Sequence, residues 1–195
     1  MIGRVDEQDD RPLVLLDLDH TIICAVETAQ LDDIQLPKSS DTYKRGLDFE
    51  GTYEIFPRPG LELFLTKLFK QYRVGVWTAA GSSYAMFIIK NFVLTKPSRT
   101  LEILQWSDHC DHSEEVYDHQ KKMHLLEGLE PGPFVILDDS PDVMDSQEDR
   151  VVDSQKWDVL EIGSAKDKFL LTDALPEIKQ KLDRQRRKKE YVLRK

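Results

Sequence analysis

Two pairs of aspartates follow short apolar runs that read as buried strands. Asp17 and Asp19 stand at the end of the first run, and Asp138 and Asp139 directly follow the last one. Because side chains alternate along an extended chain, Asp17 and Asp19 can point the same way. Neighbouring carboxylates repel each other unless a cation or a proton neutralises them, and Mg²⁺ prefers such hard oxygen ligands. Two pairs in separate loops therefore indicate a magnesium site rather than two polar strand ends.

A hydroxyl and a lysine extend this set of residues. Thr78 ends another apolar run, RVGVWT, and the adjacent Lys121 and Lys122 precede the last run. A hydroxyl can donate a hydrogen bond to a phosphoryl oxygen, and an ammonium group can neutralise phosphoryl charge. The acids, the hydroxyl and a lysine together are the parts needed to hold a metal ion and a phosphoryl group.

These residues need a scaffold that brings the ends of separate strands together. Apolar runs alternate with segments of helical periodicity, which predicts an α/β fold with a mostly parallel sheet and helices on both faces. In such sheets ligands bind at the carboxyl ends of the strands. The expected strands are 13–18, 53–56, 73–78, 101–106 and 134–137 with edge elements at 151–152 and 159–162, and the expected helices are 60–72, 82–94, 120–126 and 173–191.

The segments between these elements are short. Residues 22–57 suffice for a loop and a hairpin flap but are few for a folded lid, and residues 80–120 suffice for one helix and a small hairpin. We therefore expect small hairpin and loop insertions, no large cap, and an open site that admits a protein segment. The expected organisation is an N-terminal tail at 1–11, one globular domain at 12–176 and a basic C-terminal helix or tail at 177–195.

The composition is typical of a globular chain. It is 40% hydrophobic and 32% charged, and no apolar stretch approaches the roughly 20 residues of a membrane-spanning helix. The polar N-terminus is no signal peptide, so cytosol and nucleus are both open, and Cys24 and Cys110 are expected to be reduced thiols. The net charge is −9, although residues 184–195 hold seven basic residues and one acid. The acidic remainder argues against nucleic acid as a partner.

Four motifs resemble those of the haloacid dehalogenase superfamily: DLDHT starting at Asp17, Thr78 after its apolar strand, Lys122, and the pair Asp138-Asp139. More narrowly, YEIFPRPGLELFLTKLFKQYRVGVWTA and VILDDSPDV are similar to the FCP/SCP (NLI-interacting-factor-like) branch of protein phosphatases. The likeness covers roughly residues 12–165 and implies a Rossmannoid fold. Lys122 precedes Asp138 by 16 positions, a spacing that fits the family and favours Lys122 over Lys121.

The chemistry and the resemblance assign the same roles to the four aspartates. Asp17 is expected to attack phosphorus and form an acyl phosphate. Asp19 would protonate the leaving oxygen and then deprotonate the attacking water. Mg²⁺ would be held by an Asp17 carboxylate oxygen, the Asp19 backbone carbonyl and Asp139, with Asp138 orienting a water on the metal.

Four further residues complete the expected site. Thr78 would hydrogen-bond a phosphoryl oxygen, and Lys122 would neutralise charge on the phosphoryl group and on Asp17. Thr21 is expected to fix the loop after Asp17 and is a candidate for contacting the substrate. Arg58 could attract phosphate, although its RPG turn at a helix start fits a structural role at least as well.

The resemblance also implies a substrate class. It points to phosphoserine or phosphothreonine in a protein segment, with repeats like the RNA polymerase II tail as the best-known example. A phosphatase for small metabolites or nucleotides is the first alternative, and a non-catalytic phosphopeptide-binding scaffold is the second. Retention of the four aspartates together with Thr78 and Lys122 argues against the scaffold, which needs none of them.

Two further features have plain interpretations. The run at residues 108–112, DHCDH, fits no standard zinc spacing and is expected to be a polar loop, while His20 is expected to make backbone or solvent contacts. The basic residues 184–195 are expected to form a solvated helix end, with a partner-docking helix or a nuclear-localisation-like patch as the alternative.

Overall fold

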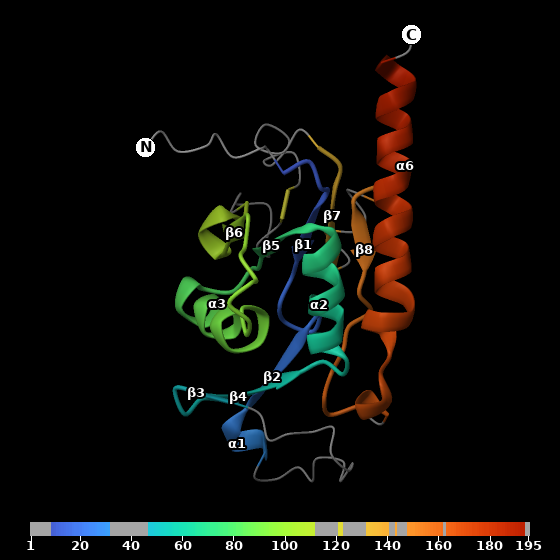
Figure 1. The fold of residues 1–195 in the computed structure, drawn as a ribbon. Helices are drawn as coiled ribbons and strands as arrows, with labels where there is room; N and C mark the ends of the chain where they lie inside the picture. The colour runs from blue at the N-terminus through green and yellow to red at the C-terminus, as the bar shows by residue number, and fades with distance from the viewer. Residues whose placement is uncertain are drawn as a thin grey trace.

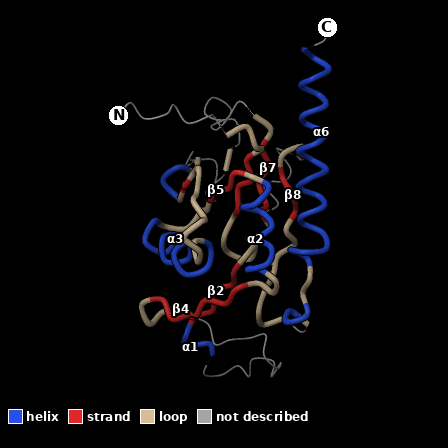
Figure 2. The backbone as a smooth tube through the Cα atoms, viewed as in Figure 1, coloured by secondary structure: helices blue, strands red, loops and turns tan. Residues whose placement is uncertain are grey.

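A five-stranded parallel sheet forms the centre of the protein, in the strand order β6-β5-β1-β7-β8 (Figures 1 and 2). The computed structural model describes residues 9–31, 47–111, 121–122, 132–140, 143, 148–161 and 163–193. Residue Leu16 of β1 lies opposite Val76 of β5 and Leu137 of β7, so these strands end side by side. The strands are β1 (Leu13–Leu16), β5 (Arg73–Trp77), β6 (Leu104–Gln105), β7 (Phe134–Asp138) and β8 (Val151–Asp153).

A second, antiparallel sheet is formed by the insertion that follows β1 in the sequence, and its strand order is β2-β4-β3. The sequence predicted a hairpin flap here but located one strand of it, 53–56. The described part of this insertion holds the three strands and one short helix, which agrees with the prediction of small insertions and no large cap. Its elements are β2 (Ile23–Glu27), α1 (Thr28–Leu31), β3 (Leu47–Phe49) and β4 (Tyr53–Pro57).

Helices α2, α3 and α6 pack their apolar residues on one face of the parallel sheet (Figure 1). Val14 and Leu16 of β1 belong to this core, whereas Leu13 and Leu15 belong to the core on the other face, because side chains alternate along a strand. All four are fully buried. The helical segments are α2 (Leu61–Gln71), α3 (Ser82–Ile88), a π-helical turn at Ile89–Val93, short 3₁₀ turns at Ser107–His109 and Ser164–Lys166, a π-helical turn at Leu170–Ala174, and α6 (Leu175–Leu193).

The α/β fold is confirmed, and most predicted elements lie within a few residues of their expected positions. The strand predicted at 101–106 is reduced to Leu104–Gln105, and the edge element predicted at 159–162 begins instead as a turn at Val159. The helix predicted at 120–126 falls largely outside the described residues, and Lys121 and Lys122 are not helical. No helix in the described part of the chain is long and apolar enough to cross a membrane.

The C-terminal helical segment begins earlier than predicted. The carboxylate of Asp167 accepts a hydrogen bond from the backbone N–H of Phe169 at 2.8 Å, which satisfies a donor at the start of the segment. Ile178 and Leu182 are buried in the core, and the Gln185 side chain bonds both backbone groups of Phe134. The first part of α6 is therefore packed against the sheet, and its last turns project beyond the body (Figure 1).

Candidate active site

The predicted acids meet at the carboxyl edge of the parallel sheet. Asp17 follows β1, Asp138 ends β7, and Asp139 comes directly after it. Each of the three offers one carboxylate oxygen, and these oxygens lie within 4.8 Å of one another. Asp17 and Asp138 are almost inaccessible, with exposures of 6% and 1%. Equal strand register in the sheet thus brings together residues that are more than a hundred positions apart.

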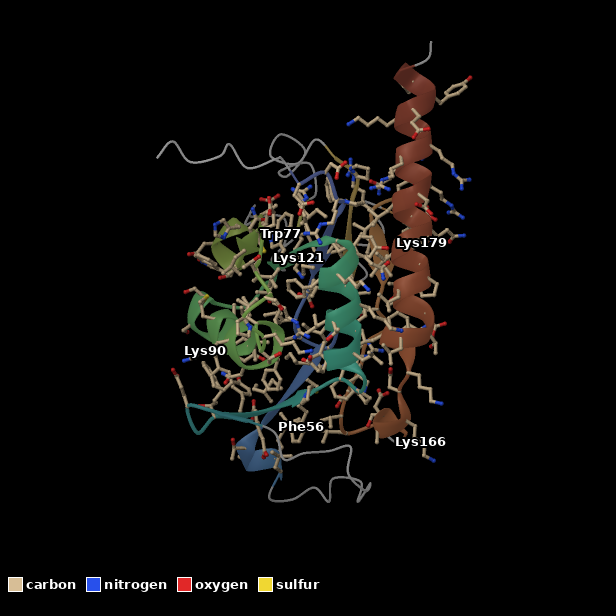
Figure 3. All side chains as sticks on the ribbon, viewed as in Figure 1. Phe56, Trp77, Lys90, Lys121, Lys166 and Lys179 are labelled. Atoms are coloured by element: carbon tan, nitrogen blue, oxygen red, sulfur yellow. The ribbon has the colours of Figure 1, made fainter. Side chains whose placement is uncertain are left out.

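A buried lysine lies between two of these acids. The ammonium group of Lys121 contacts Asp17 Oδ1 and donates to Asp138 Oδ2 at 2.7 Å. The Lys121 side chain is 4% exposed, and Figure 3 labels it in the interior near the strands of the parallel sheet. Asp138 Oδ1 accepts a further bond from the Ser140 N–H at 2.9 Å. Lys121 therefore joins the ends of β1 and β7.

The structure places Lys121, rather than Lys122, against Asp17 and Asp138. The sequence spacing favoured Lys122, but Lys122 is about one-third exposed and pairs with Asp111, away from Asp17. Consecutive side chains can point in different directions, so two adjacent lysines need not reach the same acids. Lys121 is the lysine of the acidic cluster.

Burial and mutual repulsion both act on the ionisation of this cluster. Burial raises the pKa of Asp17 well above its usual range, Lys121 opposes the shift, and Asp138 adds to it. Burial raises the pKa of Asp139 as well, again with a contribution from Asp138. Burial alone would lower the pKa of Lys121, but the two carboxylates outweigh it and raise that pKa. Burial and mutual repulsion therefore disfavour full ionisation of these acids, although Lys121 lies between two of them.

These observations test whether a divalent cation fits the site. Of the four carboxylates, Lys121 contacts those of Asp17 and Asp138, and Asp139 lies within 4.8 Å of the same two. All candidate ligand atoms are hard oxygens, which suit Mg²⁺ or Ca²⁺ rather than a soft metal. A cation among Asp17, Asp138 and Asp139 would relieve their repulsion. The residues present fit such an ion.

Asp19 has a partner that the sequence did not predict. The Tyr84 hydroxyl on α3 donates a hydrogen bond to Asp19 Oδ1 at 2.6 Å. Burial and the neighbouring carboxylate raise the pKa of Tyr84 far above its usual value, so this hydroxyl stays protonated and remains a donor. Burial raises the pKa of Asp19, and the bond from Tyr84 opposes that shift. Phe49 and Tyr53 of the antiparallel sheet pack edge-on against the Tyr84 ring.

Thr21 connects the loop after Asp17 to Asp139 and Ser154. Its hydroxyl donates to Asp139 Oδ1 at 3.2 Å and lies 3.1 Å from the Ser154 hydroxyl. Ser154 is fully buried at the end of β8 and was not singled out from the sequence. Its position directly after an edge strand is the signal that could have identified it. Because Thr21 is itself fully buried, its position favours the structural role over contact with a substrate.

The contacts of Arg58 favour the structural role over the expected contact with substrate. The side chain is 1% exposed, and its guanidinium donates to the carbonyl oxygens of Thr21 and Ser154 at 3.0 and 2.9 Å. It also pairs with Asp167 at 2.9 Å and lies over the Phe169 ring. With these partners Arg58 ties the loop after β1 to the loop after β8.

Thr78 lies at the end of β5, on the same edge as Asp17. Its hydroxyl oxygen accepts a hydrogen bond from the Ala80 N–H at 3.1 Å, which leaves the hydroxyl proton for another acceptor.

The buried thiol of Cys110 lies 3.9 Å from the Thr78 carbonyl oxygen, and both Cys110 and Cys24 are free thiols. His20 contacts the Trp157 carbonyl through Nδ1, as expected for a backbone contact.

The described part of the DHCDH run forms a turn. The Trp106 indole N–H donates to Asp108, and the Trp106 backbone N–H donates to His109 Nδ1. Among the described residues the acidic cluster at Asp17 is the one group of side chains spaced to hold a metal ion. His112 lies outside the described residues.

Comparison with known proteins agrees with this geometry. The chain matches the family described as NLI interacting factor-like phosphatase over residues 12–189. Protein 355R of Invertebrate iridescent virus 3, which its name describes as CTD phosphatase-like, is 40% identical over 116 residues, covering 57% of this chain and 62% of that protein. The protein of the same name in Invertebrate iridescent virus 6 is 36% identical over 144 residues, covering 69% and 79% of the two chains.

Two solved structures share the fold. One is of Fcp1, an essential RNA polymerase II CTD phosphatase, with a TM-score of 0.52 and 23% identity over 75% of this chain and 42% of that one. The other, fission yeast Fcp1 bound to beryllium fluoride, has a TM-score of 0.54 and 20% identity over 91% and 55%. The chain thus spans about half the length of the Fcp1 structures, which support the fold. Because the family match extends over most of the sequence, the chain belongs to the NLI interacting factor-like phosphatase family.

Proposed function

We propose that this protein is a Mg²⁺-dependent phosphatase that works through a phosphorylated Asp17 and acts on phosphoserine or phosphothreonine in a protein segment. The observation that carries the proposal is the buried contact of Lys121 with both Asp17 and Asp138 beside Asp139. A purely structural strand end gains nothing from several buried acids, because each costs desolvation free energy. A site for a cation and a phosphoryl group uses all of them.

In the first half-reaction an Asp17 carboxylate oxygen forms a bond to phosphorus while the bond from phosphorus to the substrate oxygen breaks. Asp19 gives its proton to that leaving oxygen. The raised pKa of Asp19 favours the protonated form that this step needs, and Tyr84 fixes the orientation of the carboxyl group. Lys121 and Thr78 would stabilise charge on the phosphoryl oxygens.

In the second half-reaction the ionised Asp19 takes a proton from water. The water oxygen forms a bond to phosphorus, the bond from phosphorus to Asp17 breaks, and inorganic phosphate leaves. Asp17 returns as a carboxylate and Asp19 as an acid, so the cycle closes without another reactant. The same Asp19 serves both half-reactions because it lies beside Asp17 on the loop after β1.

The metal would be held by Asp17 and Asp139, with Asp138 nearby and the Asp19 backbone carbonyl as a further candidate ligand. When bound, Mg²⁺ supplies Lewis-acid stabilisation of the phosphoryl charge. Thr21 keeps Asp139 in position through its hydrogen bond, and Arg58 holds the carbonyl of Thr21.

The preference for a protein substrate rests on the insertion between β1 and α2. Its described part is a small antiparallel sheet with one short helix. Such an insertion supports an open site at which an extended segment can bind across the strand ends. The names of the viral and Fcp1 relatives point to the same substrate class.

Hydrolysis of para-nitrophenyl phosphate tests the chemistry, with Mg²⁺ or with EDTA, for the wild type and Asp17→Asn. We expect activity that needs the metal and falls at least about 10³-fold in the variant. No turnover by the folded wild type with Mg²⁺ would refute the proposed chemistry. A panel of phosphopeptides and free sugar phosphates then tests the substrate class, and equal turnover of a sugar phosphate would reject the protein substrate.

A further inference from the structure

A groove is lined by residues of α2, of the turn at Leu170–Ala174 and of α6. It consists of two adjoining hollows of 690 and 330 Å³, which share Gln71, Tyr72 and Lys179 in their walls. The first extends toward the start of α6, and the second extends toward Pro12, just before β1. We call this surface the α2–α6 groove. Its remaining lining residues are Thr66, Lys67, Lys70, Leu171, Leu175, Pro176, Asp10, Arg11, Leu182, Asp183 and Arg186.

The floor of the groove is apolar. Leu171 and Leu175 are partly buried, while Tyr72 and Leu182 are 8% and 2% exposed. Burial raises the pKa of Tyr72, in keeping with the apolar surroundings of its ring. Leu171 and Leu175 therefore leave apolar surface that the apolar side chains of an occupant can cover.

The walls of the groove are basic. Lys67 and Lys70 line it from α2, and Lys179 and Arg186 line it from α6. All four are exposed. Within the described residues no hydrogen bond or ion pair engages the ammonium groups of the three lysines. Acids are fewer here, since Asp10 and Asp183 are the two that line the groove, in a chain whose net charge is −9.

We propose that the α2–α6 groove is a docking site for an acidic amphipathic segment of a partner protein. A neutral apolar segment would leave the lysines unmatched, and a free phosphate ion would leave the floor uncovered. A segment with apolar residues on one side and Asp or Glu on its flanks satisfies both, in the helix-in-groove mode of recognition. From Leu175 to Arg186 the groove is about 16 Å long, which accommodates about three turns of helix.

The position of the groove separates docking from chemistry. Pro12 precedes β1 and Asp17 follows it, so one end of the groove lies at the amino edge of the sheet, opposite the acidic cluster. A segment bound there leaves the carboxyl edge of the sheet, with its acidic cluster, open. The docking site is independent of the proposed activity, and its test uses binding alone.

The probe is a fluorescent peptide of about four helical turns, with leucines along one face and glutamates on both flanks. Polarisation measures its Kd for Asp17→Asn protein, in which turnover is blocked, at physiological salt. The groove variant Lys67→Glu/Lys179→Glu is compared with Lys166→Glu/Lys168→Glu, an equal charge change at exposed lysines outside the groove. Figure 3 shows Lys166 near the lower end of the molecule, away from Lys179.

We expect the groove variant to raise the Kd at least about 10-fold, because two favourable charge contacts become repulsive, and the control variant to leave it unchanged. Thermal melting and hydrolysis of para-nitrophenyl phosphate, measured with Asp17 restored, should be the same for both variants. Equal weakening in both would show that only net charge matters and would overturn the proposal. It would also fail if a scrambled peptide bound as well, if an RNA oligomer bound more tightly, or if the peptide did not bind.

Discussion

The acidic cluster and the α2–α6 groove both contain several charged groups, but these groups differ in their exposure to solvent. In the acidic cluster the charges of Asp17, Asp138 and Lys121 are buried, and Lys121 contacts both aspartates. In the groove Lys67 and Lys179 are exposed on an apolar floor. A buried pair loses much free energy when one partner is removed, whereas an exposed charge contributes little until a partner arrives. The first arrangement suits chemistry at fixed positions, and the second suits recognition.

The largest expected effect distinguishes two adjacent lysines. Lys121→Met should lower kcat for para-nitrophenyl phosphate by about 10³-fold, because it removes the buried cation beside Asp17. Lys122→Met removes an ion pair with Asp111 that is partly open to solvent and should change kcat by less than about 3-fold. A larger loss in the Lys122 variant would reverse the assignment.

Buried and exposed charges should also differ in their contribution to stability, and Arg58 is the buried example. Arg58→Met should lower the free energy of unfolding by about 3 kcal/mol, because Asp167 and two carbonyl oxygens lose a buried donor. Urea denaturation measures this change. Lys96→Met, which breaks an exposed pair with Glu62, is the control and should cost less than about 1 kcal/mol. Equal costs would contradict the structural role of Arg58.

Tyr84→Phe should have a smaller effect, on rate more than on stability. Losing the bond to Asp19 should lower kcat by about 10-fold. Because that bond lowers the pKa of Asp19, its removal should move the limb of the pH–rate profile that reports Asp19 to higher pH. Tyr53→Phe, on the ring that packs against Tyr84, is the matched control. An unshifted profile would mean that Tyr84 does not act through Asp19.

The smallest expected effect is the change in protein stability when lysines of the groove are replaced. Lys67→Glu/Lys179→Glu should change the free energy of unfolding by less than about 0.5 kcal/mol, since both side chains are exposed. Urea denaturation checks this value. A loss comparable to that of Arg58→Met would mean that these lysines support the fold and would remove the contrast between the two regions.

The sequence predicted the acidic cluster because each of its aspartates follows an apolar run, which is a local pattern. Asp17 and Asp138 each follow an apolar run, and parallel strands in register bring such ends together. The α/β fold followed from the same alternation of runs. Sequence periodicity also located α2 and β5 almost to the residue.

Other features depend on packing that no local pattern reports. Residue spacing favoured Lys122, whereas the structure brings Lys121 into contact with Asp17 and Asp138. Tyr84 reaches Asp19 because α3 packs beside the antiparallel sheet. Arg58 could be placed in a turn, but the carbonyl groups that it binds come from loops 37 and 96 positions away.

Trapping the phosphorylated enzyme tests the central claim, that Asp17 is the nucleophile, most directly. Asp19→Asn should form the intermediate from para-nitrophenyl phosphate, whose leaving group needs little protonation, and should hydrolyse it slowly. Sodium borohydride then reduces the acyl phosphate to an alcohol, which mass spectrometry locates. We expect homoserine at position 17 in the Asp19→Asn variant, and none in the double variant that also carries Asp17→Asn. Reduction at another acid, or none while para-nitrophenol is released, would contradict it.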